Sequence, residues 1–196
     1  MDFNPFKRKI TDLSSLTADK GNVLIAEPFM QDPYFKRSVV LLTEHNQDGS
    51  VGFILNNPLN IKLNEIIPDF ADFEAEVYLG GPVQPQNLFF IHDQEHLPSA
   101  IQISDGLYWD GDFELLKSWI KRGNIDHSNI RFFLGYSGWE VKQLRDEIKA
   151  QSWLISKLDK TSILTDDTEQ LWKTALQQMG KDQAIISTFP EDPRLN

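Results

Sequence analysis

The sequence predicts a single α+β domain, because segments of strand length and amphipathic helical segments both occur but do not alternate regularly. Ten apolar runs of three to six residues are rich in β-branched and aromatic residues and are separated by turn-forming residues. Three longer segments instead repeat their apolar residues at spacings of three and four. Regular alternation would favour a doubly wound parallel sheet, so its absence favours the α+β class.

Ten strands are expected, eight of them before residue 135 and two after it. They are VLIA (23–26), SVVLLT (38–43), VGFIL (51–55), EVYL (76–79), LFFI (88–91), IQI (101–103), LYW (107–109), IRFFL (130–134), WLI (153–155) and AII (184–186). Between the second and third runs, Asn46 and the Asp48–Gly49 pair suit a hairpin loop. We therefore expect those two strands to pair antiparallel.

Three helices are expected from periodicity, at 112–122, 139–150 and 168–179, with a short helical turn at 63–67. Gly123 follows the first helix as a C-terminal cap, and the third helix ends before Gly180. The segment 130–154 should form one packing unit with six largely buried side chains. These are Phe132, Leu134, Trp139, Leu144, Ile148 and Trp153.

Length, composition and charge limit the classes of function. A chain of 196 residues, 40% of them hydrophobic, is long enough to bury a substantial core. The formal net charge of −10 provides no long-range attraction to nucleic acid or an anionic membrane. The absence of cysteine fits a reducing compartment, and no signal or membrane-spanning segment is recognisable, so we expect a cytoplasmic protein. The expected organisation is a weakly ordered arm at 1–20, one domain at 21–190 and a tail at 191–196.

The stretch GYSGW (135–139) nearly matches the GxSxG elbow that carries the nucleophile of α/β-hydrolases. The elbow requires glycine two residues after the serine, and this chain has Trp139 there. Ser137 and Glu140, three residues apart ahead of an amphipathic run, instead fit a capping box at a helix N-terminus. We therefore expect Ser137 to cap a helix, with a nucleophilic role as the alternative.

Three stretches together resemble the AlgH/YqgE family of bacterial proteins. They are residues 21–59, 77–92 and 134–154, including VYLGGPVQPQNLFFIH and LGYSGWEVKQLRDEI. The resemblance implies an intracellular α+β domain with a mostly antiparallel, bifurcated and partly barrel-like sheet. It also implies a regulator of transcription without an established biochemical activity. The family more often has alanine at the position of Ser137, which argues against a family-wide serine hydrolase.

The sequence HDQEH (92–96) matches the HxxEH pattern of certain zinc proteases. For both histidines to bind one zinc ion, the segment would have to be helical. It continues a predicted strand, in which His92 and His96 would lie about 13 Å apart. We therefore expect a polar surface connection and no metal site, and the sequence indicates no cofactor.

Residues with binding chemistry gather at the predicted strand ends. Gly80–Gly81–Pro82 could expose backbone N–H groups to an anion, and Asn56 could offer an amide, although turn chemistry alone explains such residues. If these strand ends converge, they predict a small ligand-binding cleft. Its expected residues are Glu44, His45, Asn56, Gly81, Tyr136 and Trp139.

The basic residues form only small groups, at Lys7–Arg8–Lys9, Lys36–Arg37, Lys117–Lys121–Arg122 and Lys142–Arg145–Lys149. Acidic neighbours offset the last group, and no helix-turn-helix is recognisable, so direct DNA binding is disfavoured. With no intact catalytic motif, the sequence favours a nonenzymatic regulatory or accessory protein that acts through a protein partner or a small ligand. The alternative is a small-molecule hydrolase that uses the glycine-rich strand ends with His92 or His45.

Overall fold

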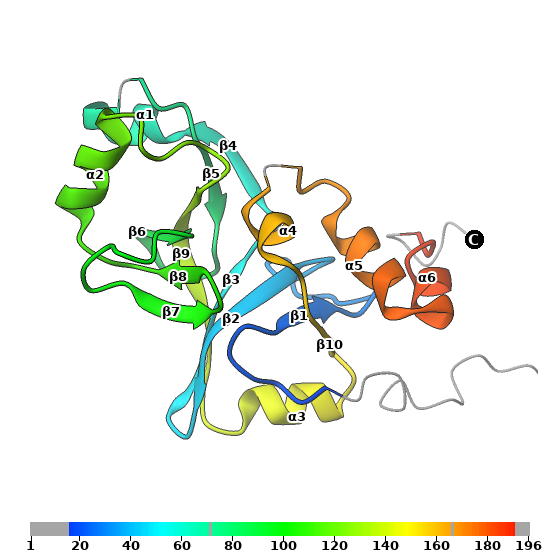
Figure 1. Cartoon of the computed structure of the whole chain (residues 1–196). Helices are drawn as coiled ribbons and strands as arrows, with labels where there is room; N and C mark the ends of the chain where they lie inside the picture. The colour runs from blue at the N-terminus through cyan, green and yellow to red at the C-terminus, as the bar shows by residue number, and fades with distance from the viewer. Residues whose placement is uncertain (1–15, 71, 166, 191–196) are drawn as a thin grey trace, which may run out of the picture.

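One long strand, β9 (Ile130–Trp139), organises the fold because it pairs with three other strands. It runs antiparallel to β3 and β6 and parallel to β5. The computed structural model describes residues 16–70, 72–165 and 167–190. Figure 1 shows β9 passing from one part of the sheet into the other.

The first part of the sheet has the strand order β10–β1–β2–β3–β9, with all neighbours antiparallel. Its other strands are β1 (Val23–Ala26), β2 (Val39–Asn46), β3 (Gly49–Ile54) and β10 (Trp153–Ser156). The predicted hairpin joins β2 to β3, with a bulge between Leu42 and Glu44. The predictions for these strands and for their antiparallel hairpin are confirmed.

The second part continues from β9 through β6 (Val83–His92), β8 (Leu107–Trp109) and β7 (Ile101–Ser104). On its other side, β9 pairs with β5 (Glu76–Leu79), which pairs with β4 (Pro58–Lys62). The sheet therefore divides at β9, and the predicted α+β class with a mostly antiparallel, bifurcated sheet is confirmed. The sequence analysis missed β4, which begins with a proline.

Three helices are substantial: α2 (Phe113–Lys121), α3 (Gln143–Lys149) and α5 (Leu171–Met179). The predicted turn at 63–67 is α1 (Leu63–Ile66), followed by the 3₁₀ turn η3 (Pro68–Phe70). Two short helices were not predicted, α4 (Lys160–Leu164) and α6 (Lys181–Ile186). The strand prediction for 184–186 is wrong, because α6 continues directly from α5 after Gly180.

Each face of the first sheet part packs against different helices, as side-chain alternation requires. Val23, Ile25 and Leu41 share a core with α4 and α5. Leu24 and Val40, which point the other way, pack with α3 and the two tryptophans Trp139 and Trp153. In Figure 1, α3 lies below the sheet and α5 and α6 lie to its right.

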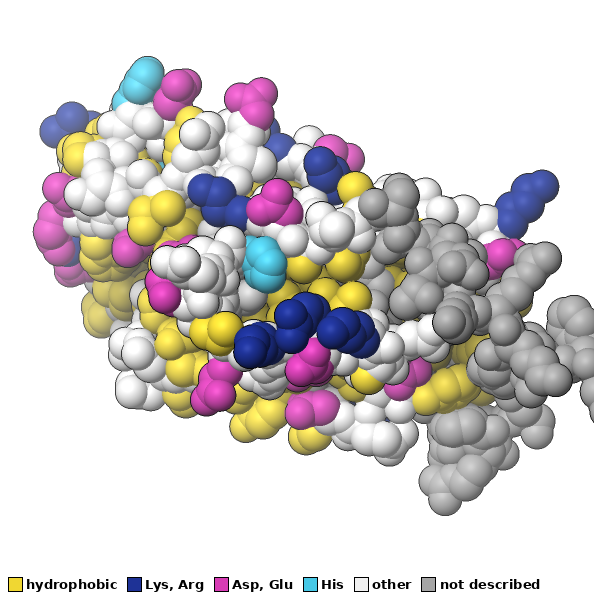
Figure 2. All heavy atoms as spheres, turned by 90° about the horizontal axis from the view of Figure 1, so that it is seen from below, with side chains coloured by type: hydrophobic (Ala, Val, Ile, Leu, Met, Phe, Trp, Pro, Cys, Tyr) yellow, Lys and Arg dark blue, Asp and Glu magenta, His cyan; other side chains and the backbone are white. Residues whose placement is uncertain are grey.

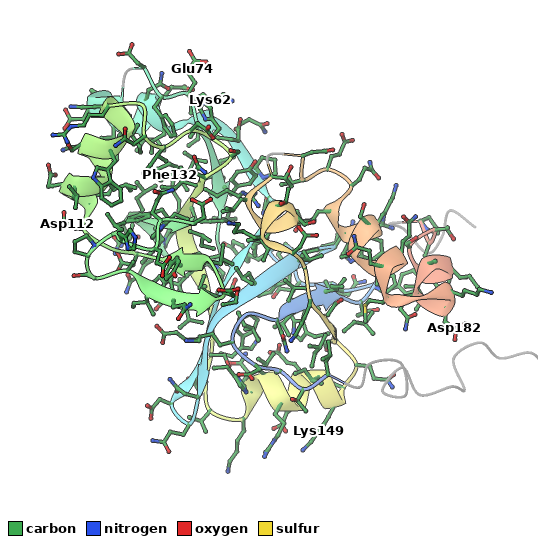
Figure 3. All side chains as sticks on the ribbon, viewed as in Figure 1. Lys62, Glu74, Asp112, Phe132, Lys149 and Asp182 are labelled. Atoms are coloured by element: carbon green, nitrogen blue, oxygen red, sulfur yellow. The ribbon has the colours of Figure 1, made fainter. Side chains whose placement is uncertain are left out.

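A third core fills the second part of the sheet, between β9 and the segment that contains α1, η3 and α2. Phe132 is fully buried there, and Figure 3 shows it in the interior, whereas Lys149 projects outward from α3. Of the six side chains expected to be buried in 130–154, Leu134 and Ile148 are only partly buried. Ile148 lies near the end of α3 and packs at the edge of the core formed by Leu144, Trp139 and Trp153.

A buried arginine joins three elements. Arg131 of β9 is 1% exposed, and its guanidinium donates to the carbonyl oxygens of Leu55 and, at 2.9 Å, Ile163. The same guanidinium lies 3.9 Å from the ring centre of Tyr78. A buried cation costs several kcal/mol unless it is hydrogen-bonded, so Arg131 requires the end of β3 and helix α4 to be in place.

The two glycine motifs of the sequence pack against each other. A Cβ on Gly80 would overlap the carbonyl oxygen of Gly135, and a Cβ on Gly81 would overlap the backbone of Tyr136. A Cβ on Gly135 would lie 2.6 Å from the carbonyl oxygen of Gly81. These glycines allow the β5–β6 connection to cross β9 with the two backbones in contact.

The expected arm at 1–20 and tail at 191–196 lie largely outside the described residues. Of the arm, residues 16–20 are described, and the Nζ of Lys20 donates to the carbonyl oxygen of Gln102 at 2.9 Å. Within the described ranges, every helix is too short or too polar to cross a membrane.

We predict that Gly80→Ala lowers the free energy of unfolding by about 2 kcal/mol or more, because the added methyl group has no space at the backbone crossing. Gly138→Ala is the matched control, since its Cβ would make only ordinary contacts, the nearest at 3.4 Å. Urea unfolding of the two variants measures the difference. Equal stability of the two would contradict the close crossing.

Candidate functional site

A groove of about 380 Å³ opens between the β2–β3 hairpin and the C-terminal end of β9. Glu44, Asp48 and Val51 line it on the hairpin side. Tyr136 and Gly138 of β9 line the other side, together with Val83 and Glu140. We call this feature the hairpin groove. It combines an apolar floor with acidic side chains.

Three of the six predicted ligand-binding residues, Glu44, Tyr136 and Trp139, line the hairpin groove, although the indole of Trp139 lies on the opposite face, against α3. Gly81 lies directly behind it, against the backbone of Tyr136. His45 is adjacent in sequence to Glu44, but its side chain lies on the opposite face of β2. The predicted cleft therefore corresponds to the groove in part, and ligand binding by these residues stays a prediction.

Asn56 does not join the other five. Its Oδ1 accepts from the N–H of Val39 at 2.8 Å, and its Nδ2 donates to the carbonyl oxygen of Arg37 at 2.9 Å. It lies five residues beyond Val51, roughly 16 Å along an extended chain. Its amide thus joins the start of β2 to the end of β3, at the opposite end of the strands from the groove.

The capping-box prediction for Ser137 and Glu140 is wrong. Ser137 lies inside β9, is fully buried, and donates from Oγ to the carbonyl oxygen of Gly80 at 3.0 Å. Helix α3 begins only at Gln143, whose Oε1 accepts from the N–H of Glu140. The hydroxyl of Ser137 therefore secures the backbone crossing, and its burial also argues against a nucleophilic role.

Glu147 is an important residue that the sequence analysis did not identify. Its Oε2 accepts from the indole N–H of Trp139 at 2.8 Å and from that of Trp153 at 2.7 Å. The two indoles pack edge to face, with ring centres 6.0 Å apart. The available signal in the sequence was the position of Glu147, one helical turn after Leu144, which is buried. Glu147 holds α3 on one face of the sheet and leaves the groove on the other.

The described residues contain one close serine–histidine pair near the groove. His45 Nδ1 lies 2.8 Å from Ser50 Oγ, and the two residues are directly opposite in the β2–β3 hairpin. Ser50 is among the residues that line the groove, whereas His45 is not. Because Ser50 precedes Val51, strand alternation directs its side chain to the face occupied by Trp139 and α3. The pair is a cross-strand contact on the α3 side.

His92 is buried, although a polar surface connection was expected at 92–96. It ends β6, and its Nε2–H donates to the carbonyl oxygen of Asp110 at 2.8 Å. Its Nδ1 accepts from the N–H of Gln94 at 3.1 Å, so the imidazole is neutral. Both ring nitrogens are thus engaged with the backbone. Burial lowers the pKa of His92, and this effect outweighs the hydrogen bond to Asp110, which raises it.

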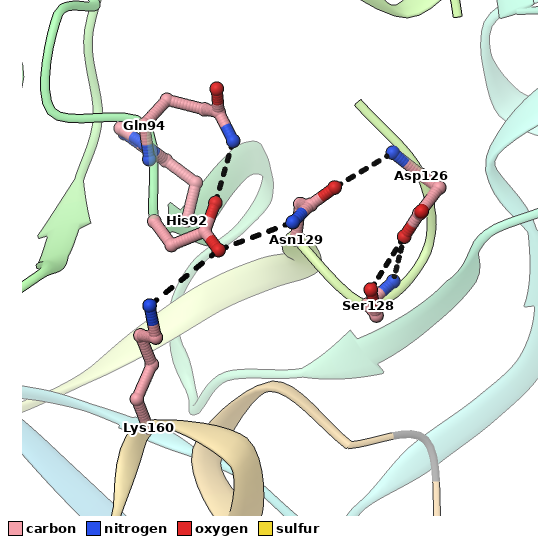
Figure 4. A network of polar contacts seen from close by, with 7 residues as sticks. His92, Gln94, Asp126, Ser128, Asn129 and Lys160 are labelled. Atoms are coloured by element: carbon pink, nitrogen blue, oxygen red, sulfur yellow. Dashed lines mark hydrogen bonds and ion pairs between the residues drawn. The ribbon is translucent and has the colours of Figure 1, made fainter. Parts of the chain in front are cut away.

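Asp93, the next residue, organises a polar network that connects the end of β6 to helix α4 (Figure 4). Its carboxylate accepts from the side-chain amides of Gln94 and Asn129 and lies 3.8 Å from the Nζ of Lys160. Asn129 in turn accepts from the N–H of Asp126. Such a network holds the connected loops in place. Among the described residues, no cluster of histidine and acidic groups could hold a metal ion.

The exposed basic residues of α3 do not form a broad cationic surface. Figure 2 shows lysine and arginine side chains in a row on the face that α3 occupies, with acidic side chains beside them. Arg145 and Lys149 each lie 3.6 Å from Asp146. Lys117 pairs with Asp69 and Glu114 at 2.8 and 2.9 Å. The group Lys7–Arg8–Lys9 lies outside the described residues.

Sequence comparisons find related chains of nearly the same length. A family profile described as AlgH-like matches residues 23–184. A UPF0301 protein of Parabacteroides distasonis is 47% identical over 180 residues, which cover 90% of this chain and 91% of the relative. A UPF0301 protein of Cytophaga hutchinsonii is 43% identical and covers 90% of this chain and 98% of its own length.

Two solved structures have the same fold. The solution structure of the AlgH protein from Pseudomonas aeruginosa has a TM-score of 0.69 and 28% identity, and covers 90% of this chain and 97% of its own. A crystal structure of a Corynebacterium diphtheriae protein has a TM-score of 0.78 at 21% identity, and covers 94% of this chain and 100% of its own. The second likeness concerns the fold alone.

We predict that acidification destabilises the protein through His92. Well above pH 6.5, the ordinary pKa of histidine, the imidazole is neutral in both the folded and the unfolded state and has no effect on stability. Below this value the unfolded chain binds the proton more readily than the folded one. The free energy of unfolding therefore decreases as the pH is lowered. Urea unfolding between pH 7.5 and 5.5 should show a smaller pH slope for His92→Gln than for the unmodified protein.

His96→Gln is the control for this experiment, because it also removes one imidazole, from an exposed position. If both variants changed the slope equally, burial of His92 would not be the cause.

Proposed function

The chain belongs to the AlgH-like family, and we propose that it is a nonenzymatic cytoplasmic protein with a regulatory or accessory role. In this proposal it acts by holding a protein partner or a small ligand in the hairpin groove. The observation that carries the proposal is the groove itself, which has binding chemistry but, among the residues that the structure describes, no histidine in its lining to activate Ser50. A regulatory effect on transcription would then be indirect.

The chemistry of the candidate residues supports binding rather than turnover. Ser137 is buried and donates to a backbone carbonyl, and His92 uses both ring nitrogens in backbone contacts. A general base must reach the proton that it removes, and neither residue is accessible. The backbone N–H groups of Gly80 and Gly81, considered as an anion site, lie at the crossing with β9.

Direct DNA contact is not part of the proposal, because the described basic side chains form only small groups, and those of Lys117, Arg145 and Lys149 are offset by carboxylates. Nonspecific DNA affinity comes from neutralising several phosphates at once. A net charge of −10 opposes that attraction at long range.

We predict that Gly138→Val abolishes the cellular function while the protein stays folded. The added side chain projects into the groove and should weaken the complex by at least about tenfold. The measurement is capture of the tagged protein from its own cells, together with complementation of a deletion strain. Ala150→Val, at an exposed position outside the groove, should behave like the unmodified protein. Full complementation by Gly138→Val would refute the proposal.

The second candidate function is a small-molecule hydrolase, and the observation that favours it is the contact between His45 and Ser50. We predict no serine-dependent turnover on a panel of esterase and amidase substrates. Ser50→Ala should retain any background rate, because the pair faces the α3 side of the sheet. Turnover that Ser50→Ala and His45→Ala both remove would establish the hydrolase instead.

A further inference from the structure

The floor of the hairpin groove is formed by residues in register across three strands. Glu44 lies opposite Val51 on β3, and Val51 lies opposite Gly138 on β9. Residues in register share a face of the sheet, and Tyr136 shares it too because it lies two positions before Gly138. Val83 lies opposite Tyr136 and extends this face to β6.

Gly138 differs from the glycines of the backbone crossing. Its φ is not in the left-handed region, and a Cβ there would lie 3.4 Å from Cε2 of Tyr136 and 3.8 Å from Cγ2 of Val83. Neither backbone conformation nor close packing therefore requires glycine at this position. The missing side chain instead leaves the strand backbone exposed at the floor of the groove.

The hydrogen-bond directions of β3 determine which backbone groups of β9 are available. The N–H of Ile54 donates to Gly80 beside β9, whereas the N–H of Leu55 donates to Val39 at β2. Backbone polar groups alternate in direction along a strand. Even-numbered residues of β3, including Gly52, therefore bond to β9, and odd-numbered residues bond to β2.

Gly138 pairs with an odd-numbered residue, Val51, so its N–H and C=O point away from β3. On that side, pairing with β6 ends where Val83 meets Tyr136. No strand lies beside Gly138 there among the residues that the structure describes. An unpaired strand edge accepts the backbone of an extended peptide.

The charges in the groove define the chemistry of the peptide. Glu44, Asp48 and Glu140 line the groove, and no lysine, arginine or histidine does. Across the described chain, none of the three carboxylates has an ion-pair partner within 4.0 Å. The ring of Tyr136, held edge to face against Phe89 at 5.7 Å, adds a surface suited to a cation.

We propose that the hairpin groove binds an extended segment of a partner protein. The segment pairs its backbone with Gly138 and places a lysine or arginine side chain beside the three groove carboxylates. This inference rests on the proposed function, since it names the occupant of the same groove.

The test is selection from a displayed library of random linear peptides on the immobilised protein, followed by fluorescence anisotropy with the selected peptides. Enriched peptides should contain lysine or arginine and few acidic residues. Gly138→Val and Glu44→Lys should each weaken their binding at least about tenfold. Glu169→Lys makes the same charge change at an exposed position outside the groove and should leave peptide binding unchanged.

Backbone pairing is tested with peptides that are N-methylated at one position at a time. One methylation should weaken binding to the unmodified protein as much as Gly138→Val does, because it removes the donor to the Gly138 carbonyl. Displacement of the peptide by spermidine at equal concentration would show a site for small cations only, and would overturn the proposal. Enrichment of acidic peptides, or of none, would also overturn it.

The two proposals can fail separately. If no basic peptide binds but Gly138→Val still abolishes complementation, the groove is functional and its occupant is of another class. If Gly138→Val complements fully, the groove is not the functional site, whatever peptides it binds.

Discussion

The structure depends on β9 having three strand neighbours, because this single strand joins both parts of the sheet. A strand has only two edges, so β9 can have three neighbours only if they are distributed along its length. β5 and β6 flank residues 132–134, and β3 takes over one edge at 137–139. The exchange occurs at Gly135, whose φ of 68° produces the local change in direction. The glycines at 80 and 81 let the chain that leaves β5 cross at the same place.

The groove is a consequence of this exchange. Because the chain must cross β9 at Gly81 before β6 starts, pairing between β6 and β9 reaches no further than Val83 and Tyr136. In the part of the chain that the structure describes, the last residues of β9 therefore keep one strand neighbour, β3, and one open edge. At Glu140, Gln143 satisfies the backbone from within the chain, with its N–H donating to the Glu140 carbonyl and its Oε1 accepting from the Glu140 N–H. Among the described residues Gly138 has no such partner outside the strand pairing, so the open edge is concentrated at the residue without a side chain.

Local signals in the sequence predicted most of the elements, because strand composition, helical periodicity and the Asp48–Gly49 turn act over a few residues. They failed where contacts between distant segments decide the outcome. Ser137 and Glu140 have capping-box spacing, but Ser137 is bound to Gly80, 57 residues away, and the strand continues to Trp139.

For the site, Glu44, Tyr136 and Trp139 were chosen by residue type, and the structure places them along one groove. Asn56 was indistinguishable from them in sequence, since its role depends on Val39 and Arg37 across the hairpin. Gly138 was overlooked because the role of a glycine depends on the atoms that surround it, and the sequence alone does not give their positions.

Alternate residues at the end of β9 lie on opposite faces of the sheet, one face packed against α3 and the other facing the groove. Ser137 and Trp139 point to one face, where the first donates to Gly80 and the second is held by Glu147 beneath α3. Tyr136 and Gly138 point to the other face, and no described core residue covers Gly138. The contacts of Ser137 and Trp139 thus hold the backbone of Gly138 in position at the floor of the groove, and no helix has to move to expose it. This arrangement suits a protein that recognises a segment of another chain, because the backbone groups that a partner must meet are already in place before it arrives.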